Sequence, residues 1–496
     1  MSANHAVNGT MDPHTSTAGA RGNLATLLTT GGWFATGLVT LLALLVRVIR
    51  LGQPARIIFD ETYYAKDAWS LFKMGYEGSW DEHSDIGFAL GTTSGLTPEA
   101  SFVVHPPLGR WLIALGFLGT SGGPTPFAWR ISAAIFGVLG VFLAARIAWQ
   151  ISRSVVAVSL SGVFLATDGL HVAMSRVALL DIFMSTLVLL AVWAVLRDGT
   201  SLRGTSPPHS TWWRPYLALA GVALGCAVAV KWSALWSLAV IGLFVAIRDW
   251  ARKKQRGHLT FLSAVSGAAS DFVYLVGTAA LVYVTSWWSW FRTPQSWGRP
   301  GSGKVAGNGT PWSDWWAYHG RVWEFHQGVT APHSYQSSPT DWVLQTKPTL
   351  LYFNRVPGCK TGCVEIVSTL GNPLLWWLGL GAAIWALAMI LLHRPEASNL
   401  TLLLVVYASQ LLPWFLYPER TKFSFYAASL APYVAILLGL GLTWLTQSPR
   451  PRWLRRVSWL LALAVVASGF WFLPIATGFP ISIEQWEQHK LLESWW

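Results

Sequence analysis

Long apolar stretches with almost no charged side chains constrain this chain more than any other feature. We count eleven, at about 32–49, 129–149, 154–170, 178–196, 215–231, 233–249, 270–291, 374–393, 400–416, 423–446 and 456–476. Each is close to the roughly 20 residues that an α-helix needs to cross a bilayer. Charged residues make up only 12% of the chain, about half the share of a soluble domain. The sequence therefore predicts an all-α polytopic membrane protein and excludes a soluble enzyme.

Basic residues in alternate connections predict the orientation of the spans. The excess of Lys and Arg, Arg203 included, falls in the connections 150–153, 197–214, 250–269, 394–399 and 447–455. Cytoplasmic loops of membrane proteins carry such an excess. We therefore expect these connections and the N-terminus in the cytoplasm, and the chain after Pro480 outside. Because the net charge of +12 lies in short loops, it indicates a bilayer rather than a nucleic-acid partner.

The chain divides into three parts. Residues 1–30 are polar and predict a disordered cytoplasmic arm, since they lack the features of a signal peptide. Residues 31–480 hold every span, and 481–496 form an external tail. Only two external loops, 50–128 and 292–373, are long enough to carry chemistry. The segment 107–120 is too short for a span, and we expect it to form an amphipathic helix at the outer surface.

Two adjacent carboxylates, Asp60 and Glu61, follow the first span in RIIFDETYYAKDAW. One interpretation is structural, because Asp and Glu favour the first turn of a helix. The other is a general base that faces a substrate embedded in the membrane. The residues alone leave both interpretations open.

Basic side chains from distant parts of the chain share the outer face in this topology. They are Arg130, Arg176, Lys231, Arg420 and Lys422. Such a convergence predicts a site for an anionic, lipid-linked substrate. His105 and Arg110 bracket the motif HPPLGR, where a cation suits a phosphate or a lipid headgroup.

The connection TDGLHVAMSRVALLD is expected to place four polar groups together at the outer membrane surface. They are Asp168, His171, Arg176 and Asp181. A structural salt bridge between Arg176 and Asp181 is the alternative to a substrate site.

Motifs for nucleotide, nicotinamide or zinc chemistry are absent from the sequence. His319, His326 and His333 recur every seven residues, but Pro332 interrupts the segment and we interpret them as loop histidines rather than metal ligands. Oxygen ligands for a divalent cation could come from Asp60, Glu61 and Asp181, although nothing in their spacing requires one. We therefore expect no cofactor. Cys359 and Cys363 lie close together outside, where a disulfide is a hypothesis.

Seven motifs in order resemble the protein O-mannosyltransferase family, a group of membrane glycosyltransferases of the GT-C class. They are FDETYY, HPPLGR, SRVALLD, VKW, HSYQSSP, LGNPLLWW and RTKFSFYAASLAPY. The resemblance spans about residues 30–480 and is strongest to actinobacterial members. It implies a GT-C bundle of about eleven transmembrane helices in a bacterial plasma membrane, with 31–480 as the catalytic domain.

The resemblance also implies a reaction. Mannose would pass, with inversion, from polyprenyl-phosphate-mannose to Ser or Thr hydroxyls of secreted proteins on the outer face, with transfer during translocation left open. Asp60 would be the catalytic base, Glu61 would hold the acceptor or orient the site, and Arg130 would contact the donor phosphate. Arg176, Lys231 and Arg420 would also bind the donor.

Two departures and two alternatives accompany the resemblance. Arg110 stands where many members have Lys, which changes the geometry of its hydrogen bonds. FSFYAAS lacks the histidine that follows tyrosine in eukaryotic members. The same fold acting on a lipid or cell-wall glycan is one alternative, and a lipid-phosphate transporter is the other, although transport predicts internal repeats that we do not find.

Overall fold

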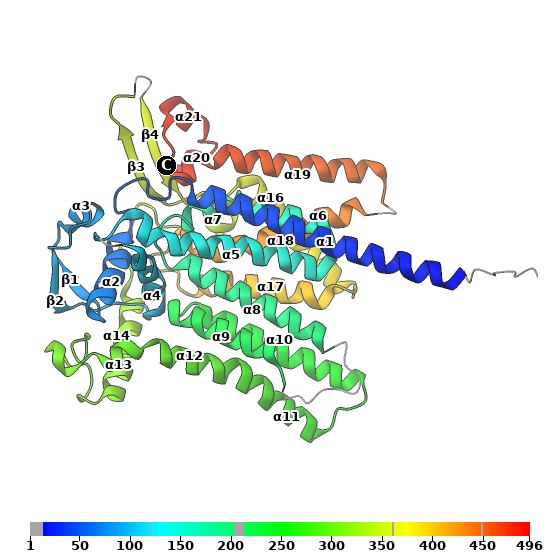
Figure 1. Ribbon diagram of the computed structural model, residues 1–496, viewed down its shortest axis with the longest axis horizontal. Helices are drawn as coiled ribbons and strands as arrows, with labels where there is room; N and C mark the ends of the chain where they lie inside the picture. The colour runs from blue at the N-terminus through cyan, green and yellow to red at the C-terminus, as the bar shows by residue number, and fades with distance from the viewer. Residues whose placement is uncertain (1–12, 121, 203–212, 360–361, 448–449) are drawn as a thin grey trace, which may run out of the picture.

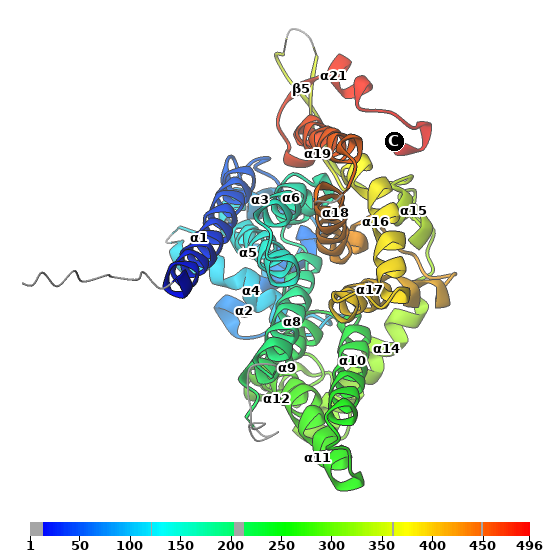
Figure 2. The same ribbon diagram turned by 90° about the vertical axis from the view of Figure 1, so that its right-hand side faces the viewer.

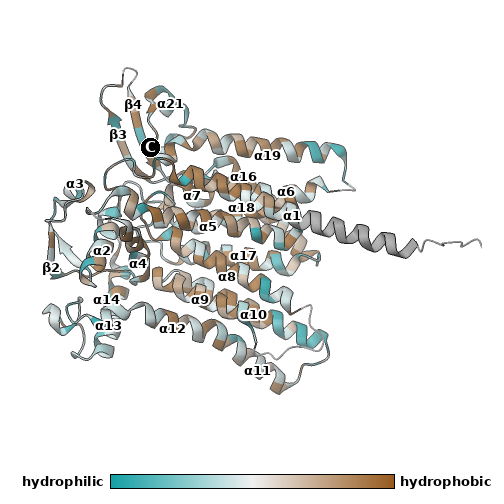
Figure 3. Ribbon diagram, in the orientation of Figure 1, coloured by the Kyte–Doolittle hydropathy of each residue, from teal (hydrophilic) through white to brown (hydrophobic). Residues whose placement is uncertain are grey.

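The computed structural model of the protein describes residues 13–120, 122–202, 213–359, 362–447 and 450–496. Long helices run side by side as a bundle, and short helices and strands gather at one end of it (Figure 1). Apolar residues concentrate along the bundle helices, whereas hydrophilic residues mark their ends (Figure 3). This distribution is the one that a bilayer requires of a multi-pass protein.

Eight helical segments in the described residues are long and apolar enough to cross a membrane. They lie within α1 (Pro13–Val48), α5 (Pro126–Ser152), α8 (Asp181–Ser201), α10 (Ala234–Gln255), α11 to α12 (Phe261–Ser286), α16 (Pro373–Leu391), α17 with η4 (Ala397–Leu416) and α19 (Arg452–Phe472). The other three expected spans coincide with shorter helices, namely α6 (Val155–Ala166), α9 (Pro215–Val230) and α18 (Ala431–Thr446). The count of eleven spans therefore stays a prediction.

The three short helices are interrupted where their ends are buried in protein. α6 continues after a break into α7 (Gly169–Met174), α9 ends at Lys231, and a 3-10 turn, η5 (Ser424–Ser429), precedes α18. Helix α18 packs between α6 and α16, as the end-on view shows (Figure 2). Irregular backbone is tolerated at membrane depth only where protein or a cavity surrounds it. These breaks bring polar residues to one end of the bundle.

Side-chain caps explain where several bundle helices begin. The side chains of Thr125, Ser154, Asp168 and Asn372 accept hydrogen bonds from backbone N–H groups in the first turns of α5, α6, α7 and α16. Proline follows at the first turn of α5 and α16, where its missing N–H costs nothing.

The N-terminal prediction is partly wrong. We expected a disordered arm over 1–30, but α1 begins at Pro13. Residues 1–12 lie outside the described residues, as does Arg203. Once the apolar part of α1 is helical, each further residue adds a hydrogen bond without a new nucleation cost. Polar composition alone therefore does not keep 13–30 out of the helix.

One end of the bundle holds residues 50–125 and 288–372, and we name it the loop end. It contains most of the short elements. After α1 come α2 (Glu61–Met74), β1 (Gly78–Trp80), α3 (Ser84–Ala89), β2 (Leu96–Ala100), α4 (Leu108–Ala114) and η1 (Leu115–Gly119). The predicted surface helix over 107–120 thus corresponds to α4 and η1. It packs against α2, α5 and α9, with Ile113 and Phe117 buried and Leu115 and Leu118 exposed.

The second large loop contributes α13 (Trp288–Arg292), η3 (Pro300–Ser302), α14 (Pro311–Gly328), α15 (Pro339–Leu344), and the strands β3 (Leu350–Val356) and β4 (Cys363–Ser368). β3 and β4 form an antiparallel hairpin, and a Cys359–Cys363 disulfide closes its tip, which confirms that hypothesis.

The C-terminal segment, expected as a separate tail, is integrated into the fold. After α20 (Pro474–Thr477), strand β5 (Ile481–Ser482) pairs with β4, and α21 (Ile483–Gln488) and η6 (Glu493–Trp495) follow. The Trp495 ring is fully buried and donates a hydrogen bond to the Gln345 carbonyl at 2.6 Å. Burial of this large aromatic ring explains why the segment packs against the loop end.

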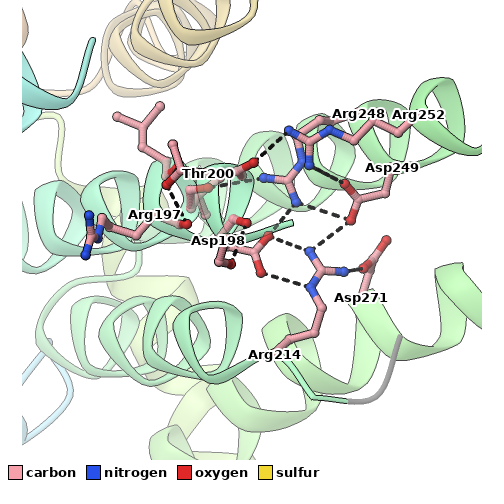
Figure 4. Close-up of polar contacts among 12 residues, drawn as sticks. Arg197, Asp198, Thr200, Arg214, Arg248, Asp249, Arg252 and Asp271 are labelled. Atoms are coloured by element: carbon pink, nitrogen blue, oxygen red, sulfur yellow. Dashed lines mark hydrogen bonds and ion pairs between the residues drawn. The ribbon is translucent and has the colours of Figure 1, made fainter. Parts of the chain in front are cut away.

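The opposite end of the bundle holds a buried network of charged residues that the sequence analysis missed (Figure 4). Arg214 pairs with Asp198, Asp249 and Asp271 at 2.6, 2.9 and 2.7 Å. Arg248 pairs with Asp198 and Asp249, each at 2.7 Å. The network joins the ends of α8, α9, α10 and α11. Part of the basic charge that we assigned to cytoplasmic loops is therefore neutralised inside the protein.

Arg214→Leu is expected to destabilise the protein by about 3–5 kcal/mol, because it leaves buried carboxylates without their partner. Thermal unfolding in detergent measures the change. Arg321→Ala is the control, since Arg321 and Glu324 form an exposed pair that contributes about 0–1 kcal/mol. Equal unfolding temperatures for the two variants would contradict a structural role for the network.

Candidate active site

Asp60 lies at the N-cap position of α2, but its side chain does not cap the helix. Its carboxylate is partly buried and makes no hydrogen bond to any other described residue. Burial raises the pKa of the Asp60 carboxyl to about 6, while Lys231 opposes the rise and Asp181 adds to it. At pH 7 the ionised form is therefore favoured about ten to one. An ionised, unpaired carboxylate with such a pKa suits a general base.

Glu61 has the opposite environment, although it is the next residue. It is fully buried, and its two oxygens accept hydrogen bonds at 2.8 Å from Nε and Nη2 of Arg130. The backbone N–H groups of Ile58 and Ala178 donate to the same carboxylate at 2.9 and 3.0 Å. Four donors therefore hold Glu61 in place, and it has no oxygen left for a substrate proton.

Arg130, for which the resemblance implies contact with the donor phosphate, binds groups of the chain itself. It is fully buried, and besides Glu61 it donates to the carbonyls of Leu51, Pro54 and Arg56. All the N–H groups of its guanidinium are used inside the chain, so none is left to contact a donor phosphate. Arg130 instead ties α5 to the segment that carries Asp60. Sequence could not reveal this pairing, because the partners are 69 residues apart.

Lys231 and Asp181 form a second buried ion pair beside Asp60. Lys231 Nζ lies 2.7 Å from Asp181 Oδ1 and 4.2 Å from the centre of the Tyr426 ring. The break at the end of α9 and the first residue of α8 place these two charges. The Lys231 ammonium thus balances Asp181 while it remains on the wall of the cavity described next.

A cavity of about 660 Å³ opens beside these residues. Its polar end includes three predicted site residues, His105, Lys231 and Arg420. Its other lining residues are Trp232, Ser233, Leu235, Trp236, Ala239, Trp323, His326, Gln327, Thr330, Ser409, Gln410, Pro413, Trp414, Leu416, Tyr417, Pro418, Glu419 and Tyr426. Those from α10 and η4, namely Leu235, Trp236, Ala239, Pro413, Trp414 and Leu416, are apolar. The cavity thus combines a basic end with an apolar wall, as an amphipathic lipid phosphate requires.

Two histidines at the basic end are neutral at physiological pH. Burial holds the pKa of His105 well below its usual value, and the positive charges of Lys231 and Arg420 act in the same direction. Burial and Arg420 lower the pKa of His326 to about 4. The two rings lie 5.2 Å apart, and Arg420 donates to the His326 carbonyl. Lys231 and Arg420 are thus the Lys and Arg side chains among the lining residues.

His326 is a site residue that the sequence analysis dismissed. We predicted that His319, His326 and His333 are loop residues because Pro332 interrupts the segment. In the structure α14 ends at Gly328, before that proline, so His319 and His326 are helical. The seven-residue spacing, two helical turns, was the signal that could have placed these two on one face.

The remaining predicted cations have structural partners. Arg110 pairs with Glu77 at 2.7 Å. Arg176 donates to five carbonyls, four of them from 46–50 at the C-terminal end of α1. The alternative of an Arg176–Asp181 salt bridge is therefore wrong. Arg176 instead binds carbonyls that have no helical partner and attract a cation. Lys422 donates to the carbonyls of Tyr417 and Pro418.

The carboxylates considered for a divalent cation do not fit one. Both oxygens of Glu61 are occupied by Arg130 and backbone donors, and Asp181 is neutralised by Lys231. Of these three carboxylates Asp60 alone makes no hydrogen bond or ion pair to a described residue, and a single carboxylate is a poor cation site. No group of three or more potential ligands is assembled within the described ranges.

Comparison with known proteins agrees with this geometry. The sequence model for dolichyl-phosphate-mannose-protein mannosyltransferases matches residues 37–296, and the one for the C-terminal four-span region of protein O-mannosyltransferases matches residues 311–495. A polyprenol-phosphate-mannose–protein mannosyltransferase of Mycobacterium tuberculosis is 31% identical, over 94% of this chain and 92% of its own. The protein of that name from Corynebacterium glutamicum is 30% identical over 88% of each chain.

The chain belongs to the protein O-mannosyltransferase family. Its fold agrees with this assignment. The yeast Pmt1–Pmt2 protein O-mannosyltransferase complex bound to its sugar donor superposes with a TM-score of 0.73 at 14% identity, over 94% of this chain and 92% of that chain. ArnT from Cupriavidus metallidurans superposes with a TM-score of 0.52 at 15% identity, over 90% and 77%. The predicted GT-C membrane fold is confirmed.

Glu61→Gln is expected to lower the stability of this family member by about 3–5 kcal/mol, because it leaves Arg130 buried beside a neutral amide. Glu82→Gln, an exposed change in the same loop, is the matched control and should be close to neutral. Thermal unfolding of the purified proteins compares them. If Glu61→Gln were as stable as the control, the buried pair would not be the anchor of this loop.

Proposed function

We propose that this protein transfers mannose from polyprenyl-phosphate-mannose to Ser or Thr hydroxyls of secreted proteins, at the extracytoplasmic face of a bacterial plasma membrane. The names of its mycobacterial and corynebacterial relatives support the donor and the protein acceptor. The observation that carries the proposal is Asp60, a partly buried carboxylate within electrostatic range of Lys231 on the cavity wall, whose side chain neither caps α2 nor bonds to another described residue.

The arrangement of the two ends supports the proposed outer-face location. Helix α2, which Asp60 precedes, and the C-terminus lie at the loop end, whereas α1 starts at the opposite end (Figure 1). The end of α10, the connection from α16 to α17 and the start of α19 lie at that opposite end (Figure 1), and they contain Lys253, Arg394 and Arg452. Basic residues favour the cytoplasmic side, so the loop end faces outward.

The donor fits the cavity with its phosphate at the basic end. Lys231, which also pairs with Asp181, and Arg420 are the basic side chains there. The prenyl chain would lie along apolar residues such as Leu235, Trp236 and Pro413. Apolar lining removes the chain from water or lipid without a polar cost, while the cations fix the phosphate.

Transfer then needs one base and a stabilised leaving group. Asp60 takes the proton from the acceptor hydroxyl as the oxygen attacks C1 of mannose. The bond from C1 to the phosphate oxygen breaks, and its electron pair leaves with the polyprenyl phosphate. Attack on the face opposite the leaving group inverts C1. Lys231 and Arg420 stabilise the charge that develops on the phosphate, so no general acid is needed.

No cofactor takes part in this proposal. The activated sugar arrives on a lipid, so a nucleotide site has no role. Two of the three carboxylates once considered for a cation are committed elsewhere, Glu61 to Arg130 and Asp181 to Lys231. The side chains of Lys231 and Arg420 stabilise the charge on the leaving phosphate, and they act more strongly in a partly buried site than in water.

Asp60→Asn should lower mannose transfer by about 10²–10⁴-fold, because the amide cannot accept the hydroxyl proton. The assay supplies membranes with radiolabelled polyprenyl-phosphate-mannose and a Ser/Thr-rich peptide, at equal protein levels. Asp81→Asn, an exposed substitution in the same loop, is the control and should keep parental activity.

The same assay distinguishes other outcomes. Undiminished transfer by Asp60→Asn would exclude Asp60 as the base. Label in lipid or glycan rather than peptide would change the acceptor, and donor binding without transfer would indicate transport instead of catalysis.

The pH dependence of transfer should follow Asp60. The base must be ionised, and its pKa lies near 6, so kcat/KM should fall as the pH drops below about 6. Asp181→Asn removes a charge that raises the Asp60 pKa, so the acidic limb should move to lower pH. A limb that stayed in place, or moved to higher pH, would contradict this electrostatic coupling.

A further inference from the structure

Phe59, the residue before Asp60, has an unusual backbone. Its φ is +48°, in the left-handed region that side chains other than glycine rarely adopt. A bulky residue is disfavoured there because its Cβ approaches the following carbonyl oxygen. Such a conformation persists only where surrounding structure holds it, and it is concentrated at functional sites. The side chain of Phe59 must therefore be held by its neighbours.

Three rings hold it. Phe59 packs edge to face against Phe423, Phe425 and His333, with centroids 5.9, 5.7 and 6.4 Å apart. Phe423 and Phe425 stack on each other at 5.3 Å, and His333 contacts Phe423 at 5.0 Å. We name these three residues the aromatic clamp. They come from chain segments more than 270 residues after Phe59.

The clamp is itself fixed by hydrogen bonds between its two segments. The N–H of Ser337 donates to the Lys422 carbonyl at 2.8 Å, and the N–H of Thr421 donates to the Val329 carbonyl at 2.9 Å. Phe425 also contacts Tyr426, whose ring lies over Lys231 on the cavity wall. The segment Phe423–Tyr426 therefore both packs against Phe59 and contributes to the wall of the donor cavity.

The conformation after Phe59 explains why Asp60 is free. An N-cap Asp normally has extended backbone angles and caps the N–H groups of the first turn. Asp60 instead has φ −70° and ψ 0°, and it makes no such bond. On either side, Ile58 and Glu61 are tied together by a hydrogen bond of 2.9 Å. A residue with left-handed φ thus stands directly before the uncapped Asp60.

We propose that Phe59 is a positioning residue, and that the aromatic clamp holds its left-handed backbone so that the Asp60 carboxylate faces Lys231 and the cavity instead of capping α2. This inference rests on the proposed role of Asp60 as the base. Phe59 makes no contact with the substrate in this inference. Phe59 affects the geometry of proton transfer, where a misplacement of about 1 Å lowers the rate about 10²-fold.

The test compares three substitutions at this position. Phe59→Gly frees the backbone and removes the ring, and should lower kcat about 10–100-fold while the KM for polyprenyl-phosphate-mannose stays within about threefold. Phe59→Tyr keeps the ring and should restore kcat. Phe59→Leu keeps bulk without aromatic edges and should fall between them. Thermal unfolding is recorded for each, and kcat is compared at equal folded protein.

The pH profile separates positioning from a merely structural role. In Phe59→Gly a less confined Asp60 is better hydrated, so the acidic limb of kcat/KM should move to lower pH, whereas loss of folded protein would lower the rate without moving the limb. Phe423→Leu loosens the clamp while Phe59 stays, and should shift the limb in the same direction. This second variant gives the answer if Phe59→Gly does not fold.

Two results would overturn the inference. One is a kcat for Phe59→Gly within twofold of the parent protein. The other is a fall in kcat with an unmoved acidic limb in both Phe59→Gly and Phe423→Leu. Asp60→Asn is measured alongside: if it retained activity, the proposed base would be wrong whatever Phe59 does, whereas an inactive Asp60→Asn with a fully active Phe59→Gly would reject only the positioning role.

Discussion

The buried ion pair between Glu61 and Arg130 is the interaction on which the site depends. A carboxylate and a guanidinium without solvent contact are tolerated only when every oxygen and N–H group has a partner. Here the requirement is met by bonds to the 51–58 segment and to Ala178. The pair therefore joins α5, the start of α2 and the turn before α8. Asp60, next to Glu61, is held in a rigid frame without being used to build it.

The basic side chains thus fall into two groups, those enclosed in the chain and those that keep a side on the cavity while paired to a neighbour, as Lys231 is to Asp181. Arg110, Arg176 and Arg130 are each satisfied inside the chain, while Lys231 and Arg420 remain on the wall of a cavity. Breaks in the short spans make this possible, because they bring polar backbone and side chains to one end of an apolar bundle. At the other end of the bundle Arg214 is likewise enclosed, paired with buried carboxylates.

Sequence predicted the elements whose signals are local. The apolar stretches located the helices, and FDETYY located Asp60 at the start of α2. What sequence could not predict was the partner of each charge, because the partner of Arg130 is 69 residues away and that of Arg110 is 33 residues away. A membrane-surface arginine has the same local pattern whether it binds a phosphate or a buried carboxylate. For this reason the convergence of cations stays a prediction of a site, and it could not give each residue's partner.

The central claim is that the donor occupies the cavity with its phosphate at Lys231 and Arg420 and its C1 near Asp60. An electron cryo-microscopy structure of Asp60→Asn, prepared with polyprenyl-phosphate-mannose, tests it most directly. The account predicts phosphate density beside these two cations, prenyl density along Leu235 and Trp236, and mannose C1 with the face opposite the phosphate turned toward residue 60. Phosphate density at Arg130, or a donor bound outside the cavity, would contradict it.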